Sequence, residues 1–159
     1  MGKVPADPSP QRHYPAHPTP VQRHNEPTIV LVTACILDRH PVLANDRVHV
    51  ALRTVWPQAR NWMVGYYMIM PDHVHLFCAP AEFRIEQIKT WAKYWKALLS
   101  KRAPELRAAW QPDCWDTQMR SSTHYLRKLE YVRENPVRAG LVARSEDWPY
   151  QGIMNELRW

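Results

Sequence analysis

The chain has 159 residues, of which 45% are hydrophobic, with a net charge of +6 and three cysteines. This length fits one domain with a substantial core, and the odd number of distant cysteines excludes a disulfide-rich miniprotein. No stretch has the length of an apolar membrane span, so we expect a soluble, intracellular protein. The basic balance indicates a polyanionic partner, with nucleic acid favoured over a membrane surface.

The first 27 residues differ in composition from the rest of the chain. They hold seven of the fifteen prolines and few large aliphatic side chains. Such a segment cannot bury enough apolar surface to offset the entropy of ordering it. We therefore predict a Pro-rich, disordered leader over residues 1–27 and a single domain over residues 28–159. For the leader histidines His13, His17 and His24, solvation is a simpler interpretation than weak metal binding.

The domain opens with elements typical of an α+β fold. A β-branched, apolar run over residues 28–37 predicts a buried strand, and apolar residues at helical spacing predict a helix over residues 46–58. Two strands follow over residues 62–70 and 73–79. The short Pro71-Asp72 turn between them predicts an antiparallel hairpin.

The second half repeats this pattern. An apolar stripe predicts a long helix over residues 82–102, and alternation predicts a short strand within residues 111–119. A last helix is predicted over residues 123–134, where Pro136 forces its end. The order of elements predicts a ferredoxin-like (RRM-like) α+β sandwich. Its antiparallel sheet of about four strands would carry helices on one face and leave the other face free for ligand.

His73 and His75 form the first candidate site. They are two residues apart in a predicted strand, so both rings project from one face of the sheet. Neutral imidazole is a common ligand of divalent ions, although backbone or carboxylate partners would satisfy the same rings. Asp72 flanks the pair and is a candidate general base, but its position after Pro71 favours a structural role in the turn.

Tyr131 and Asn135 form the second candidate site. They are four residues apart and would lie on one face of the last predicted helix. The amide oxygen of Asn135 would extend the two histidines to a metal site of two nitrogens and one oxygen, with positions open for water or phosphate. The Tyr131 hydroxyl would then be a nucleophile beside a Lewis acid.

These motifs resemble those of a known family. Met70-Pro71-Asp72-His73-Val74-His75-Leu76, the segment from Tyr131 to Val142, and Asp147-Trp148-Pro149-Tyr150 are similar to the motifs of the REP-associated tyrosine transposases. That family belongs to the single-tyrosine superfamily of histidine-hydrophobic-histidine (HUH) transposases and nucleases. The resemblance spans about residues 28–152, and two motifs in the right order are more specific than one. It implies that His73 and His75 bind a metal, that Asn135 stands where relatives have an amide ligand, and that Tyr131 is the nucleophile.

The resemblance also implies an activity. The protein would be a metal-dependent single-stranded DNA endonuclease and strand transferase, using Mg²⁺ or Mn²⁺, that cleaves and rejoins DNA near hairpin or repeat sequences. Attack by Tyr131 would leave a 5′-phosphotyrosine and a free 3′-hydroxyl. We expect no nucleotide cofactor, because the chain lacks a Gly-x-x-x-x-Gly-Lys loop. We expect a cytoplasmic, nucleoid-associated monomer or homodimer that does not bind membranes.

Basic side chains supply candidate contacts to DNA phosphates. They are Lys89, Lys93 and Lys96 in the long helix and Arg120, Arg127 and Arg138 near Tyr131. For the lysine row, a solvated helix face is the alternative interpretation. Two other functional classes stay open. One is a non-catalytic module that binds structured single-stranded DNA, and the other is a small metallohydrolase in which Tyr131 only packs.

Overall fold

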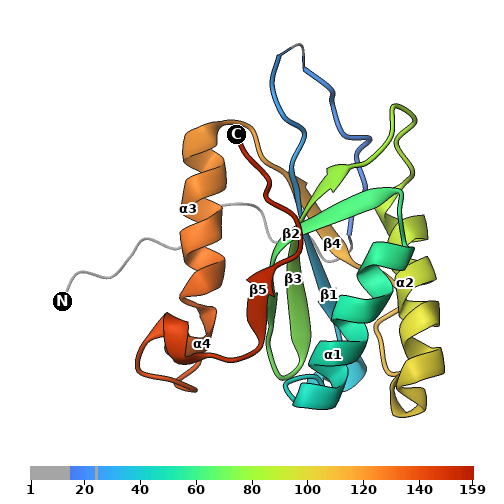
Figure 1. The fold of residues 1–159 in the computed structure, drawn as a ribbon, viewed down its shortest axis with the longest axis vertical. Coiled ribbons are helices and arrows are strands. Elements are labelled where there is room, and N and C mark those ends of the chain that lie inside the picture. The colour runs from blue at the N-terminus through green and yellow to red at the C-terminus, as the bar shows by residue number, and fades with distance from the viewer. Residues whose placement is uncertain (1–14, 24) are drawn as a thin grey trace.

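A computed structural model describes residues 15–23 and 25–159, which form one open sheet flanked by helices (Figure 1). The strands are β1 (Val30–Cys35), β2 (Trp62–Ile69), β3 (His73–Pro80), β4 (Trp115–Gln118) and β5 (Gln151–Ile153). The α-helices are α1 (Asp46–Val55), α2 (Ile88–Arg102), α3 (Ser122–Arg133) and α4 (Asn135–Arg138). All neighbouring strands pair antiparallel, in the order β4-β1-β3-β2-β5.

The first six main elements form the ferredoxin-like core. Their order is β1-α1-β2-β3-α2-β4, and β3 lies between β1 and β2 in the sheet. The Pro71-Asp72 turn closes the β2–β3 hairpin, where the Met70 amide donates to the His73 carbonyl at 2.8 Å. The predicted α+β class and antiparallel sheet are therefore confirmed.

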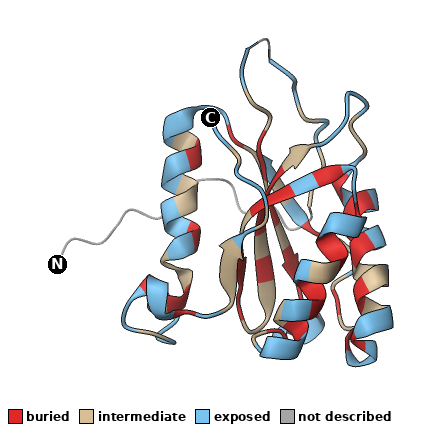
Figure 2. Cartoon of the chain, viewed as in Figure 1, coloured by how far each residue is buried: buried red, intermediate tan, exposed pale blue. Residues whose placement is uncertain are grey.

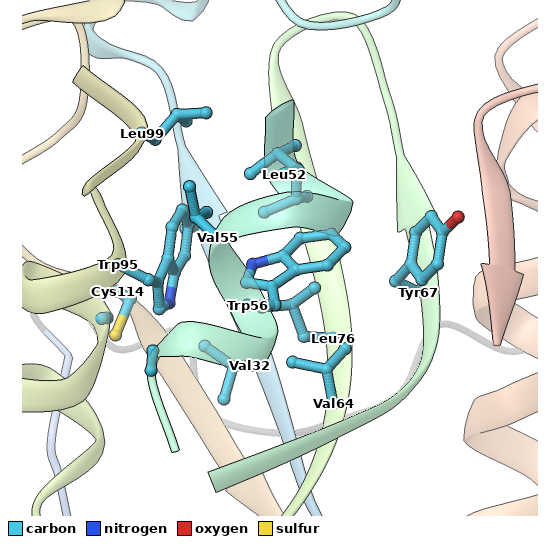
Figure 3. Close-up of a cluster of buried hydrophobic side chains, with 14 of the residues drawn as sticks. Val32, Leu52, Val55, Trp56, Val64, Tyr67, Leu76, Trp95, Leu99 and Cys114 are labelled. Atoms are coloured by element: carbon cyan, nitrogen blue, oxygen red, sulfur yellow. The ribbon is translucent and has the colours of Figure 1, made fainter. Parts of the chain in front are cut away.

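The main core lies between the sheet and the helices α1 and α2. Apolar side chains of α1 and α2 pack on one face of the central strands, and the helix surfaces away from the sheet are exposed (Figures 2 and 3). Indole rings fill much of this layer. Trp56, Trp62, Trp91 and Trp95 are at most 2% exposed, so these four rings serve packing.

The second face of the sheet is also covered, which the predicted architecture did not include. Helix α3 lies on the side of the sheet away from α1 and α2 (Figure 1). Its Tyr125 and Val132 are buried in a second cluster that includes Met68 and Phe77 of the central strands. Because these strands are apolar on both faces, they require a helix on each side. Only part of the second face remains for a ligand.

Several element boundaries differ from prediction. Helix α2 begins at Ile88 and not near residue 82. The Glu86 carbonyl accepts from the Trp62 indole at 3.0 Å, and this bond helps to hold the preceding segment outside the helix. The short β5 was not predicted, and it adds a fifth strand at the edge next to β2. None of the helices in the described part of the chain combines the length and apolar character needed to cross a membrane.

The described residues of the predicted leader have no helix or strand, and some of them contact β4. The Val21 amide donates to the Gln118 side chain at 2.8 Å, and that side chain donates back to the Val21 carbonyl at 2.7 Å. His13 and His24 lie outside the described residues, whereas His17 contacts Asp113 and Asp116. The division of the chain into a leader and a domain stays a prediction.

Candidate active site

His73 and His75 lie side by side on the sheet face that α3 covers. Their ring centroids are 4.8 Å apart, and their Nε2 atoms are separated by 3.2 Å. Strand β3 explains this placement, because the intervening Val74 is buried against the opposite layer. Both imidazoles therefore aim one nitrogen at a common point.

The other nitrogen of each ring has its own partner. Thr33 lies directly opposite His75 in the β1–β3 ladder, and its Oγ1 is 2.8 Å from His75 Nδ1. The Asp72 carboxylate accepts from His73 Nδ1 at 2.6 Å. A histidine whose Nδ1 carries the donated proton keeps its Nε2 lone pair for a metal, so these partners fix the ring orientation that a metal site needs.

Asn135 joins the histidines at the first residue of α4. Its side-chain nitrogen lies 3.0 Å from His75 Nε2 and 3.3 Å from His73 Nε2. A half-turn of the carboxamide would bring its oxygen to the same position. The two motifs that were separate in the sequence thus meet within one chain.

The three groups fit a divalent cation. Adjacent ligands of a six-coordinate Mg²⁺, each at about 2.1 Å, lie about 3.0 Å apart, close to the observed separations of 3.0–3.3 Å. Burial, with the charges of His73, Arg138 and Arg39, lowers the pKa of His75 to about 3. Burial also lowers the pKa of His73, although the hydrogen bond from its ring to Asp72 opposes this effect. Both rings are therefore neutral near pH 7, as ligands must be.

Tyr131 lies in the last turn of α3, four residues before Asn135, and 57% of the residue is exposed. The Arg138 guanidinium lies 3.9 Å from the centroid of its ring and also donates to its backbone carbonyl at 2.5 Å. Lys128 Nζ lies 5.8 Å from the same centroid. The phenol is accessible to a ligand and has cationic neighbours.

Tyr131 and Asn135 do not share one continuous helix. Helix α3 ends at Arg133 and α4 begins at Asn135, with Glu134 between them. Pro136 lies in the first turn of α4, where its missing amide proton is tolerated. The predicted end of the helix is correct to within one residue. The two residues do not share one face of a single helix, as was predicted, because the helix is broken between them.

The candidate DNA-binding residues divide between the two sides of the sheet. Arg138 contacts Tyr131, whereas Lys89, Lys93 and Lys96 belong to α2, on the side of the sheet away from α3 (Figure 1). Lys96 is partly buried, and its ammonium donates to the Gln111 carbonyl at 3.3 Å, so its role as a phosphate contact stays a prediction. Arg120 precedes α3 and Arg127 lies within it, and both are exposed, as is Arg138.

Arg39 is a neighbour of the site that the sequence did not reveal. Its guanidinium donates to Asp72 at 2.7 Å and to the Cys35 sulfur at 3.0 Å, and one of its nitrogens lies 3.4 Å from His73 Nδ1. Its backbone φ is 56°, in the left-handed region that few non-glycine residues adopt. No periodic pattern of apolar residues in the sequence predicts such a backbone turn. Thr33 was also missed, because its role depends on strand register.

Known proteins are similar to this chain in sequence and in fold. No family model matches the chain. The REP-associated tyrosine transposase of Escherichia coli K12 is 26% identical over 91 residues, which are 57% of this chain and 54% of that protein. The chain resembles the REP-associated tyrosine transposases. A Haemophilus influenzae protein with the same family designation is 28% identical over 104 residues, covering 57% of this chain and 58% of that protein. The chain thus spans little more than half the length of these curated relatives.

One solved REP-associated tyrosine transposase, in a structure with a bound REP hairpin, has the same fold. It matches with a TM-score of 0.67 at 21% identity, over 90% of this chain and 81% of that chain. This likeness, together with the observed sheet, agrees with the α+β fold expected from the motifs.

Proposed function

We propose that this protein is a metal-dependent, single-stranded DNA endonuclease and strand transferase that acts near hairpin or repeat sequences. The observation that carries the proposal is the contact of Asn135 with both histidines, which brings the two family motifs into one site. Because all three groups come from one chain, a monomer contains the whole proposed ligand set.

His73, His75 and Asn135 would hold Mg²⁺ or Mn²⁺. When bound, the ion supplies a Lewis acid that polarises the scissile phosphate. Asp72 and Thr33 hold the imidazoles so that their Nε2 atoms stay directed at the site. Thr33 belongs to strand β1 and Asp72 to the turn directly before β3, and both positions favour a preformed geometry.

Tyr131 is the proposed nucleophile. Its Oη would form a bond to phosphorus while the bond to the 3′-oxygen breaks. The products are a 5′-phosphotyrosine and a 3′-oxygen that takes up a proton, and the phenolic proton leaves to solvent. Arg138, stacked on the ring, restricts its rotation and places positive charge beside the developing phenolate. Attack by another 3′-hydroxyl on the phosphotyrosine would rejoin strands without a nucleotide cofactor.

The test is covalent capture of DNA. The protein is incubated with 5′- or 3′-labelled DNA hairpins carrying single-stranded flanks, with Mg²⁺ or Mn²⁺, and separated on a denaturing gel. We expect a metal-dependent adduct in which Tyr131 carries the 5′ end, and Tyr131→Phe abolishes it. Tight hairpin binding without cleavage would support the non-catalytic module instead, and turnover without an adduct would support a metallohydrolase.

A further inference from the structure

A second group of metal-ligating side chains lies at the β4 edge, on the α2 side of the sheet. His17 Nε2 is 2.7 Å from Asp113 Oδ1, and its Nδ1 contacts Asp116. Single ligand atoms of His17, Asp113 and Cys114 all lie within 4.8 Å of one another. Asp116 faces the same layer as Val32, its partner in β1, whereas His73 and His75 face α3. This cluster is therefore separate from the candidate active site.

The cluster is partly enclosed by the protein. Cys114 is 1% exposed and belongs to the main core, where it lies near Trp95 (Figure 3). The side chain of Asp116 is 4% exposed, and that of His17 is 19% exposed. Polar groups this far from water need a partner that matches their charge.

The contacts of His17 match the usual surroundings of a metal-bound histidine. One ring nitrogen meets the Asp116 carboxylate, which can fix the tautomer and orient the ring. The other nitrogen faces an Asp113 oxygen, and a ring nitrogen lies within 4.8 Å of the Cys114 sulfur. Each ring nitrogen of His17 faces a carboxylate oxygen, but a neutral imidazole carries a proton on only one nitrogen. At the other nitrogen, the lone pairs of nitrogen and oxygen face each other unless a cation lies between them. A metal ion is one such cation.

The donor atoms of His17, Asp113 and Cys114 determine which metal ion the site would prefer. A set of imidazole, thiolate and carboxylate suits Zn²⁺ and related transition ions, whereas Mg²⁺ prefers oxygen alone. Burial raises the pKa of the Cys114 thiol to about 12, so the thiol must release its proton to bind. Lys89, whose ammonium is 3.4 Å from Asp113, and the nearby Lys96 offset the negative charge of the donors.

We propose that His17, Asp113 and Cys114 form a zinc-type site with three protein ligands and a fourth position for water, in which Asp116 orients His17. The site would fasten the Pro-rich segment to the domain. The paired bonds between Val21 and Gln118 and the 3.0 Å bond from Arg23 to the Arg120 carbonyl continue the same attachment along β4. Metal binding here would set the path of the segment without taking part in strand cleavage.

The experiment uses Co²⁺ and Zn²⁺ with the full-length protein after treatment with chelator. We expect a thiolate-to-cobalt charge-transfer absorption, displaced by one equivalent of Zn²⁺, because the candidate active site contains no sulfur ligand. Cys114→Ser should abolish this absorption. His17→Gln, at a partly exposed position, should weaken Zn²⁺ affinity by about 10–100-fold. Cys78→Ala is the matched control, since it removes another thiol of the same core and should leave the absorption intact.

Limited proteolysis provides the second measurement. We expect Zn²⁺ to slow tryptic cleavage after Arg23 in the wild type and not in His17→Gln. The proposal is overturned if no thiolate absorption appears, or if cleavage after Arg23 is unaffected by Zn²⁺. In that case the contacts of His17 with Asp113 and Asp116 would be hydrogen bonds alone. Neither result bears on the Tyr131 adduct, so the two proposals fail separately.

Discussion

Asp72 offers a direct test of how the histidine pair is held. Its carboxylate accepts from His73 Nδ1 at 2.6 Å and from Arg39 Nε at 2.7 Å. We expect Asp72→Ala to free the His73 ring to rotate and to take up the wrong tautomer. Loss of such a support lowers metal affinity by about 10–100-fold, or about 1.4–2.7 kcal/mol. The estimate fits a charge-assisted hydrogen bond at a carboxylate only 24% exposed.

The measurement is calorimetric titration of chelator-treated protein with Mn²⁺ near neutral pH. Asp72→Asn retains a hydrogen-bond acceptor and should lose less affinity than Asp72→Ala. Asp147→Ala is a matched control, because it removes an exposed carboxylate paired with Arg144. Wild-type Mn²⁺ affinity in Asp72→Ala, with His73→Gln strongly impaired, would refute the supporting role of Asp72.

Three further predictions concern the same site. Because the folded pKa of His75 lies below its unfolded value of about 6.5, metal-free protein should lose stability as the pH falls from about 6.5 toward 3, by at most about 4 kcal/mol. Denaturant unfolding should show a smaller pH slope in His75→Gln than in the control His40→Gln, and equal slopes would contradict this assignment. Arg138→Lys keeps the charge but loses the flat stack on Tyr131, so the single-turnover rate of adduct formation should fall about tenfold with Mn²⁺ affinity unchanged. An unchanged rate would remove Arg138 as a positioning residue. Lys96→Met should leave hairpin affinity, measured by fluorescence anisotropy, within about twofold of wild type, and a larger loss would show that DNA reaches α2.

Much of the fold could be predicted because its signals are local. The Pro71-Asp72 turn between two apolar runs identified the hairpin, and the helix α1 begins after Asn45, whose side chain accepts from the Val48 amide at 3.0 Å. The position of α3 could not be predicted in this way. It depends on Met68 and Phe77 facing a second layer, and an apolar strand does not reveal how each face is covered. Strand β5 has three residues, too few for a periodic pattern.

In the candidate site, too, some residues could be predicted from local patterns and others could not. His73 and His75 share a face because side chains alternate along a strand, and their spacing of two residues in the sequence predicts this. The contact of Asn135 with those rings was expected from its donor type and from the family resemblance, because no local pattern joins segments sixty residues apart. Thr33 and Arg39 come from other segments and depend on strand register and an unusual backbone angle, so no local pattern identifies them. Lys96 follows the periodicity of a solvated row but is partly buried, since helical spacing alone does not tell which neighbours surround a face.

The helix break at Glu134 separates the segment that carries Tyr131 from the segment that carries Asn135. Asn135 is tied to the histidines by hydrogen bonds, and the Pro136 ring that follows it is buried. Tyr131 belongs to the helix before the break and is exposed. The exposed phenol and the carboxamide held by the histidines therefore belong to separate helical segments. Under the proposed function, the nucleophile that carries the attached strand would therefore belong to a different helical segment from the carboxamide that holds the ion.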